Sequence, residues 1–273
     1  MTINCRGTLI NLSTPKVMGI LNITPDSFFD GGKYKNEKDI LAQVEKMLTD
    51  GATFIDVGAY SSRPGATHIS EKEELQRIVP VIELLVKNYP EIIISVDTFR
   101  SKIAEKTIEA GAAIINDISG GKMDENMFAT VAELQVPYII MHMQGTPQNM
   151  QKNPHYENIT KELISFFSEQ IFKLHQLKVN DIIIDVGFGF GKSLEHNYEL
   201  LKKLSFFNSL DVPMLAGISR KSMLYKPLNI SAQKALNATT VANTIALLNG
   251  ANILRVHDVK EAMEAIKIVK HIQ

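Results

Sequence analysis

The chain has 273 residues, 45% of them hydrophobic and 22% charged, with 16 glycines, 10 prolines and no tryptophan. This composition excludes a disordered, collagen-like or coiled-coil protein. The 29 lysines and arginines stand against 30 acidic residues, so the net charge is −1 and no basic excess is present to neutralise a polynucleotide. We therefore expect no nucleic-acid partner.

The expected cellular setting rests on what the sequence lacks. The single cysteine, Cys5, can form no internal disulfide, which fits a reducing compartment. Residues 1–12 contain no long apolar stretch, so no signal peptide is expected. No apolar run approaches the ~18 residues that a membrane-spanning helix needs. We expect a cytoplasmic protein without a membrane partner.

Eight short apolar runs recur along the chain, each followed by a polar or glycine-rich loop and then by a stretch with helical periodicity. Continuous runs of valine and isoleucine are typical of strands buried on both faces of a parallel sheet. The predicted strands are Val17–Leu21, Phe54–Val57, Ile92–Val96, Ala113–Ile115, Tyr138–Met141, Ile182–Ile184, Pro213–Ala216 and Ile253–Val256.

A helix is predicted after each strand. Residues Ser70–Glu73 match a capping box, which opens the helix that ends near Asn88. The other predicted helices cover Glu37–Thr49, Ser101–Glu109, Glu125–Leu134, Asn158–Leu177, Glu195–Leu204, Ala232–Leu248 and Val259–Ile272.

Eight strand–helix units predict an α/β TIM (β/α)8 barrel, because eight parallel strands close a barrel. The competing architecture, an open doubly wound sheet, usually has roughly five to seven strands. The segment Ile3–Leu12, with a turn at Arg6-Gly7, predicts a hairpin that covers the N-terminal mouth of the barrel. No linker divides the sequence, so residues 1–273 are expected to form one domain.

Polar residues close nearly every predicted strand, which is where barrel enzymes carry their chemistry. The two carboxylates and the amide among them suit an aminopyrimidine-like heterocycle, whose N–H donors match carboxylate oxygens. The arginine and histidine after the last strand suit a phosphate. The set comprises Asp97, Asn116, Asp185, Lys221, Arg255 and His257.

The glycine-rich segment Asp185–Ser193 does not match a nucleotide-binding motif. Val186 stands where the phosphate loop needs glycine, and the Gly-x-Gly-x-Gly spacing differs from the dinucleotide fingerprint. We expect these glycines to let the backbone approach a flat ligand, with Phe190 as an apolar wall.

Eight motifs, in order and at predicted strand ends, resemble the dihydropteroate synthase family of the folate pathway. They are Met18–Phe28, Gly58–Gly65, Val96–Thr98, Ile115–Gly121, Met141–Pro147, Asp185–Lys192, Gly217–Ser222 and Arg255–Asp258. The resemblance implies an eightfold α/β barrel. It also implies a transferase that joins 6-hydroxymethyl-7,8-dihydropterin diphosphate to 4-aminobenzoate, giving 7,8-dihydropteroate and diphosphate.

The resemblance also implies roles for individual residues. The catalytic residues would be Asp97, Lys221, Arg255 and His257. Asp97 and Lys221 would hold the pterin together with Asn116 and Asp185. The remaining two catalytic residues would hold the diphosphate with Asn22, which would also ligate Mg²⁺.

The implied substrate site extends to the aminobenzoate. Its frame would be Phe28, Ser62, Arg63, Pro64, Phe190, Lys221 and Ser222. Thr24, Met141 and Gly217 complete the implied substrate-binding set. In the family, the loops that correspond to Thr24–Lys35 and Ser61–His68 close over bound substrates.

A dissociative displacement is the expected mechanism. An arylamine is already neutral at pH 7, so the difficult step is breaking the bond to the charged leaving group. Magnesium, Arg255 and His257 would neutralise charge on the diphosphate, Asp97 would stabilise the pterin cation, and loop closure would exclude water.

Some positions depart from the family or admit a structural interpretation. Ser62 stands where the family usually has threonine, Tyr60 where an acidic residue is common, and Phe29 where a small residue is usual. Asp56 is interpreted as a structural hydrogen-bond acceptor. Arg220 is assigned to structure or partner contacts, and His142 is left open between pocket and core.

The resemblance implies a homodimer whose interface includes the region Ala235–Leu248. Two other functions stay open: a pterin-binding barrel that transfers a methyl group to a corrinoid, and a binding protein without catalysis. The aminobenzoate-type loop Ser61–Gly65 argues against the first, and the intact set of pocket residues argues against the second.

Overall fold

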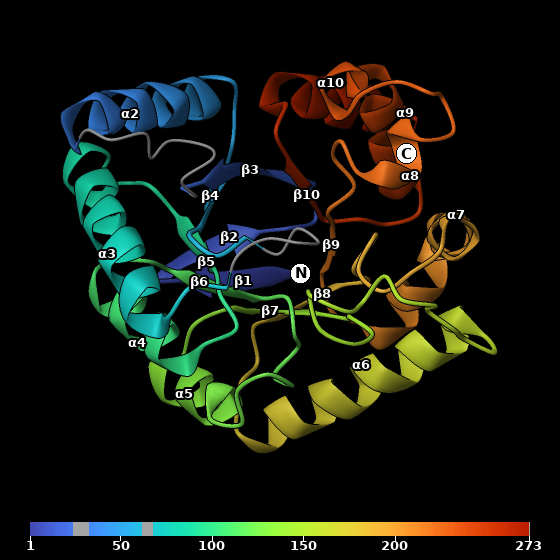
Figure 1. Cartoon of the computed structure of the whole chain (residues 1–273), viewed down its shortest axis with the longest axis horizontal. Coiled ribbons are helices and arrows are strands. Elements are labelled where there is room, and N and C mark those ends of the chain that lie inside the picture. Colours follow the sequence, from blue (N-terminus) through green and yellow to red (C-terminus); the bar gives the residue numbers. More distant parts are fainter. Residues whose placement is uncertain (24–32, 62–67, 273) are drawn as a thin grey trace.

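The computed structural model describes residues 1–23, 33–61 and 68–272. Eight parallel strands close a barrel in chain order, with the last strand pairing with the first (Figure 1). They are β3 (Lys16–Asn22), β4 (Phe54–Gly58), β5 (Ile94–Asp97), β6 (Ile114–Asp117), β7 (Tyr138–Met141), β8 (Ile182–Asp185), β9 (Met214–Ala216) and β10 (Ile253–Val256). The predicted TIM barrel is confirmed.

Helices surround the barrel on its outer side (Figure 1). They are α2 (Lys33–Thr49), α3 (Glu71–Asn88), α4 (Ser101–Glu109), α5 (Met127–Leu134), α6 (Ile159–Gln176), α7 (Leu194–Lys202), α8 (Ser222–Tyr225), α9 (Leu236–Leu248) and α10 (Val259–Val269), with 3-10 turns η1 (Leu204–Leu210) and η2 (Ala232–Lys234). The predicted helix Ala232–Leu248 is therefore two elements, η2 and α9, and the short α8 was not predicted.

The predicted capping box at α3 forms only in part. The Ser70 hydroxyl accepts a hydrogen bond from the Glu73 amide at 3.2 Å, but the Glu73 carboxylate pairs with Arg77 at 2.5 Å. A reciprocal box stands instead at α7, where Ser193 and His196 each accept from the other's backbone amide. Histidine takes the place usually held by glutamate or glutamine.

The barrel interior is layered, because side chains along a strand face inward at every second residue. An apolar layer fills the end where the strands begin. Its members from the strands are Met18, Phe54, Ile114, Ile139, Ile183, Leu215 and Ile253. The next inward position on these strands is often polar, so a polar layer stands on an apolar floor.

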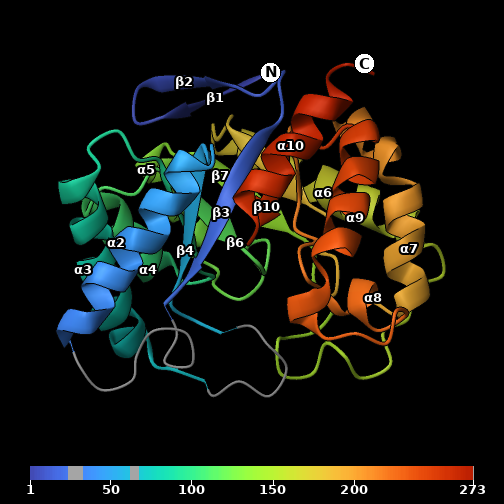
Figure 2. The ribbon, with the colours of Figure 1, turned by 90° about the horizontal axis from the view of Figure 1, so that it is seen from above.

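The N-terminal hairpin covers this floor from outside (Figure 2). Strands β1 (Thr2–Cys5) and β2 (Thr8–Asn11) pair antiparallel across the two-residue loop Arg6-Gly7. Both loop residues have positive φ, 53° and 85°, as a type I′ hairpin turn requires. Ile3 and Cys5 are buried against the apolar layer, so the predicted covering of the N-terminal mouth is confirmed.

Ile3→Ala should lower the free energy of unfolding by about 2–5 kcal/mol, because Ile3 is 1% exposed and its truncation leaves a cavity under the barrel. The matched control is Leu9→Ala, on the same hairpin but 70% exposed, which should change it by less than about 0.5 kcal/mol. Denaturant unfolding measures both. Equal small losses would show that the hairpin does not stabilise the barrel.

Candidate active site

The strand periodicity brings the candidate residues together. Five of them stand two positions after a residue of the apolar layer and so face the same interior, nearer the C-terminal mouth. They are Asn116, Met141, Asp185, Gly217 and Arg255. Asp97, at the end of β5, joins them through its ion pair with Arg255.

Arg255 lies between two carboxylates. Its Nε donates to Asp56 Oδ2 at 2.6 Å, and its Nη2 donates to Asp97 Oδ2 at 2.9 Å. Burial opposes the charge, but the two carboxylates raise the pKa of the guanidinium above its usual value. These bonds use two of the five N–H donors of the guanidinium, and the other three make no hydrogen bond to residues 1–23, 33–61 and 68–272.

Asp56 is the structural acceptor that its position in the strand predicts, and it also anchors the site. Its carboxylate is fully buried and accepts from the Ser95 hydroxyl at 2.6 Å, the Asn116 amide at 3.1 Å and Arg255. A buried charge needs such partners. Its anchoring of Arg255 was missed, although its place two residues after the inward-facing Phe54 was a signal for an inward carboxylate.

Burial disfavours the charged form of the Asp97 carboxyl group. Burial raises the pKa of Asp97 to about 7; Arg255 acts against this rise and the nearby charge of Asp56 adds to it. Asp97 therefore takes up a proton at higher pH than an ordinary carboxyl group does.

Asp185 and Lys221 interact electrostatically at the mouth. Asp185 is 5% exposed and accepts a hydrogen bond from the Gly187 amide at 2.8 Å. Burial raises the pKa of Asp185, and the ammonium of Lys221 acts in the opposite direction. Burial lowers the pKa of Lys221 to about 8, against the attraction of Asp185. Each group favours the charged form of the other.

Lys221 also contacts the loop that follows β8. Its Nζ donates to the carbonyl oxygen of Phe188 and lies 4.7 Å from the centre of the Phe190 ring. The electrostatic fields of Asp97, Asp185 and Arg255 all act on Lys221. The four residues therefore surround one common region rather than separate surfaces.

The glycines of this loop do not all serve a ligand, contrary to the expectation. A Cβ on Gly187 would lie 2.1 Å from the carbonyl oxygen of His142, and one on Gly191 would lie 2.5 Å from that of Gln144. These two glycines therefore let the loop after β8 pack against the loop after β7. Only Gly189 is open, its nearest neighbour being the Lys221 side chain at 3.5 Å.

The loops after β9 and β10 are joined to each other. The Ser219 hydroxyl lies 3.0 Å from His257 Nδ1 and accepts from the His257 amide at 3.2 Å. Arg220 forms a bidentate pair with Asp258, at 2.8 and 2.7 Å. Arg220 thus has the structural role considered for it, and the predicted Ser222 begins α8 beside it.

Asn22 faces the same mouth from the end of β3. Gly58 leaves space there: a Cβ on it would lie 3.7 Å from Asn22 Oδ1 and 3.7 Å from Asp97 Oδ2. No group of three or more histidine, cysteine or acidic side chains with metal-binding geometry occurs within residues 1–23, 33–61 and 68–272. A cation at this position would therefore need other ligands, such as the Asn22 amide oxygen, water or substrate oxygens.

Several candidate positions fall outside the described residues. They are Thr24, Phe28, Phe29, Ser62, Arg63 and Pro64. The described residues therefore give the pterin and diphosphate parts of the predicted site, and only Phe190, Lys221 and Ser222 of its aminobenzoate part.

Two buried residues in the loops after β7 and β8 were not predicted as a pair. Lys192 and His142 are 3% and 8% exposed, and their side chains lie 3.2 Å apart. His142 therefore belongs to the core. The Lys192 ammonium has no ion pair among the residues that the structure describes.

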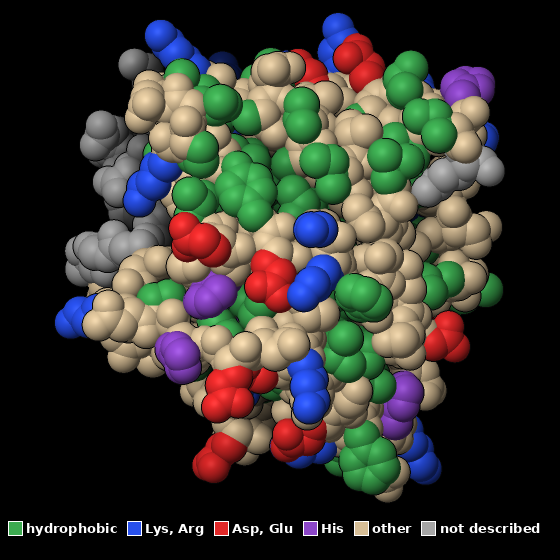
Figure 3. All heavy atoms as spheres, turned by 90° about the vertical axis from the view of Figure 1, so that its right-hand side faces the viewer, with side chains coloured by type: hydrophobic (Ala, Val, Ile, Leu, Met, Phe, Trp, Pro, Cys, Tyr) green, Lys and Arg blue, Asp and Glu red, His purple; other side chains and the backbone are tan. Residues whose placement is uncertain are grey.

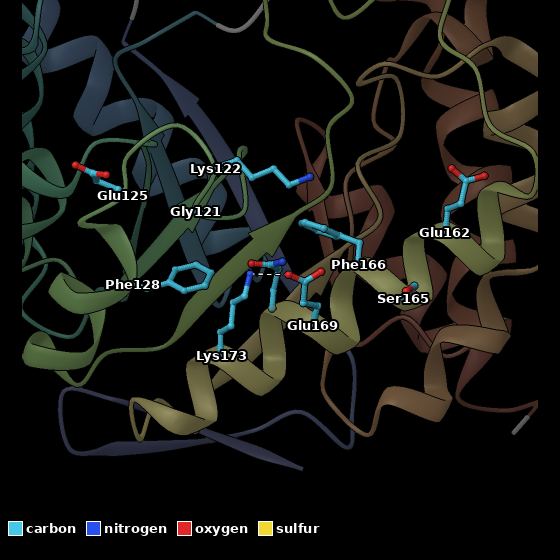
Figure 4. A pocket seen from close by; sticks show the side chains of 10 residues that line it. Gly121, Lys122, Glu125, Phe128, Glu162, Ser165, Phe166, Glu169 and Lys173 are labelled. Atoms are coloured by element: carbon cyan, nitrogen blue, oxygen red, sulfur yellow. Dashed lines mark hydrogen bonds and ion pairs between the residues drawn. The ribbon is translucent and has the colours of Figure 1, made fainter.

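A separate hollow of about 540 Å³ lies on the outside of the barrel, between α5 and α6 (Figure 4). Lys122 spans it, 4.4 Å from the centre of the Phe166 ring, and Lys173 pairs with Glu169 on its rim. None of the candidate site residues lines this hollow. It is distinct from the barrel mouth.

Comparison with known proteins agrees with this geometry. The family described as pterin binding enzyme matches residues 18–257. A closed eightfold barrel whose mouth gathers acids, an amide and cations is thus that of a pterin-binding enzyme.

Dihydropteroate synthase of Escherichia coli K12 is 43% identical over 272 residues, covering 99% of this chain and 96% of its own length. That of Haemophilus influenzae is 42% identical over 98% of each chain. The Yersinia pestis dihydropteroate synthase, solved with a sulfonamide drug, superposes with a TM-score of 0.93 at 42% identity, covering 100% of this chain and 99% of its own. The chain belongs to the dihydropteroate synthase family, whose members are transferases that form a carbon–nitrogen bond in folate synthesis.

Within the part of the chain that the structure describes, no helix is both long and apolar enough to cross a membrane.

The carboxyl of Asp97 should titrate near pH 7, and Asp56→Asn should lower this pKa, because it removes a like charge and leaves Arg255 to pair with Asp97. Ser95→Ala is the control, since it removes a neutral partner of Asp56 and keeps the charge. Carboxyl-detected NMR titration measures the shift. An unchanged or higher pKa in Asp56→Asn would contradict the assigned cause.

Proposed function

We propose that the protein condenses 6-hydroxymethyl-7,8-dihydropterin diphosphate with 4-aminobenzoate to give 7,8-dihydropteroate and diphosphate. The observation that carries this proposal is the convergence of Asp97, Asp185, Lys221 and Arg255 on one region of the barrel mouth. Dihydropteroate synthase of Xanthomonas albilineans has been solved with 4-aminobenzoic acid and with 7,8-dihydropteroate, at 36% and 34% identity to this chain.

The buried acids and amide suit the pterin. A pterin ring presents adjacent N–H donors and ring acceptors along its edge. Asp185 and Asp97 would accept from the donors, Asn116 would meet the ring edge, and Lys221 would donate to an acceptor. Met141, 2% exposed, and Gly217 would border the flat face of the ring.

The cations suit the leaving group. The three N–H donors of Arg255 that bind no described residue and the exposed ring of His257 would bind the diphosphate oxygens. Mg²⁺ would suit the oxygen of Asn22, because this ion usually takes one or two protein oxygens and completes its shell with water and substrate phosphate. Asn22 would hold it, and the ion when bound would neutralise charge on the departing diphosphate.

Bond breaking would precede attack by the amine. Asp97 as a carboxylate would stabilise positive charge on the pterin methylene carbon, while Arg255 and His257 accept the anion at the other end of the breaking bond. The loops after β3 and β4 would close over both substrates and exclude water, which would otherwise trap the cation as an alcohol.

The direct test is diphosphate release from the pterin substrate, assayed with and without 4-aminobenzoate and Mg²⁺. Rapid steady release should require both; without the amine, only slow release is expected, because water must trap the cation. Lys221→Met should lower kcat/KM by on the order of 100-fold, because it removes a donor from the reacting region. Lys226→Met, on the exposed end of α8, is the control and should match the wild type. Release that is no faster with the amine than without it, or no release at all, would overturn the proposal.

The dissociative step is tested with anilines of different nucleophilicity at saturation. The maximal rate should change by less than about threefold across the series, because bond breaking limits it. A steep rise of rate with nucleophilicity would instead require attack and departure in one step. Measured diphosphate release gives the rate for each amine.

We also propose a homodimer that forms through α9. This helix carries no charged residue, and Val241, Ile245 and Leu248 are 54%, 36% and 48% exposed on one face. Exposed hydrophobic side chains gather on the side of the molecule that α7, α8 and α9 form (Figure 3). An uncharged apolar stripe of this kind is typical of an interface between subunits.

Val241→Glu should convert the dimer to a monomer, because it places a charge in the apolar stripe. Phe172→Glu, 65% exposed on α6, is the control and should stay dimeric. Analytical ultracentrifugation measures the mass. A monomeric wild type at micromolar concentration would exclude the dimer.

We further propose that the protein acts in the cytoplasm. The support for this location is Cys5, which is buried and unpaired.

A further inference from the structure

Lys192 is a buried lysine whose partners are not carboxylates. It is 3% exposed, and its Nζ lies 3.1 Å from the carbonyl oxygen of His142, 3.0 Å from that of Phe190 and 3.2 Å from His142 Nδ1. Burial lowers the pKa of Lys192 well below its usual value. In the charged form Nζ has three N–H donors and no acceptor, so these three partners use its full capacity. The side chain is built into the structure rather than free to reach a ligand.

The three partners belong to two different loops. His142 opens the loop after β7, and Phe190 belongs to the loop after β8. The backbones of these loops touch at Gly187 and Gly191, where no other residue would fit. Lys192 therefore fastens the two loops to each other at their line of contact.

Each carbonyl of the loop after β8 from residue 188 to 191 accepts a hydrogen bond from a side chain: two of the donors come from the segment between β7 and α6, one from the loop itself and one from the start of α8. Lys221 donates to Phe188, Gln151 to Gly189 at 2.5 Å, Lys192 to Phe190 at 3.0 Å and Tyr156 to Gly191 at 2.8 Å. Of these four donors, Lys192 is the one whose bond fixes the residue that carries the predicted ligand wall.

His142 completes the arrangement as an acceptor. Burial, together with the positive charge of Lys192, lowers the pKa of His142 to about 2, so the imidazole is neutral. Nδ1 then accepts from the ammonium and the proton lies on Nε2. The ring itself is fixed by edge-on packing against Phe166, at 5.0 Å between ring centres.

We propose that Lys192 is a positioning residue for the reaction: by binding the Phe190 carbonyl it fixes the Phe190 ring, which in turn orients the Lys221 ammonium toward the substrates. The path is continuous, because the Phe190 ring lies 4.7 Å from Lys221 Nζ. This inference rests on the proposed function and adds a residue to its machinery.

Lys192→Met keeps the length of the side chain and removes all three donors. The carbonyls of His142 and Phe190 then lose a partner, and the loop is expected to shift. A displacement of about 1 Å at a site can cost up to about 100-fold in rate, so kcat/KM should fall by about 10- to 100-fold. Lys202→Met, an exposed lysine on α7, is the matched control and should stay within about twofold of the wild type.

A double-mutant cycle with Phe190→Ala separates positioning from general support of the fold. If Lys192 acts through the ring, then Lys192→Met should cost less than about threefold in the Phe190→Ala background, because the ring is already absent. If Lys192 only supports the fold, the two losses multiply, and the inference is wrong. Circular dichroism and denaturant unfolding of each variant establish that folded proteins are compared.

Lys192→Gln provides the second variant if Lys192→Met does not fold, since its amide retains a donor, and the same coupling to Phe190→Ala is expected. An inactive wild type would overturn the proposed function itself. An active wild type with Lys192 variants of normal kcat/KM would overturn only the role of Lys192.

Discussion

The site depends on the burial of a charged layer on an apolar floor. Asp56 is fully buried inside the barrel and is stable there only because Ser95, Asn116 and Arg255 donate to it. Arg255 in turn is held at a fixed place, and three of its donors are unused within the described part of the chain. A guanidinium held in this way can meet an anion without rearranging, and this preorganisation is what electrostatic catalysis requires.

Burial shifts the pKa values of the acid Asp97 and the base Lys221 in opposite directions. Asp97 has a raised pKa and Lys221 a lowered one, so both are close to exchanging a proton with their surroundings near neutral pH. In open water neither group would be, since their usual values lie several pH units away on either side. Burial in the barrel thus changes the pKa of an ordinary carboxyl group and of an ordinary amine.

Much of the barrel was predictable because each strand is a short run buried on both faces, and such runs of valine and isoleucine stand out from the amphipathic helices between them. The predicted residues at the strand ends converge because all parallel strands of a barrel end at the same mouth. Contacts between loops were not predictable in this way. The role of Lys192 depends on three acceptors from two loops, and no local pattern marks it. The box at Ser193 was missed because His196 replaces the usual glutamate or glutamine.

The hairpin beneath the barrel has a consequence for solvation. Ile3, Cys5 and Leu12 keep water away from the underside, so the charged layer contacts bulk solvent from one direction only. Any molecule that fills the mouth then removes the last high-dielectric medium from these charges, and every attraction among them strengthens as it arrives. The ligand itself would complete the insulation of the site from water.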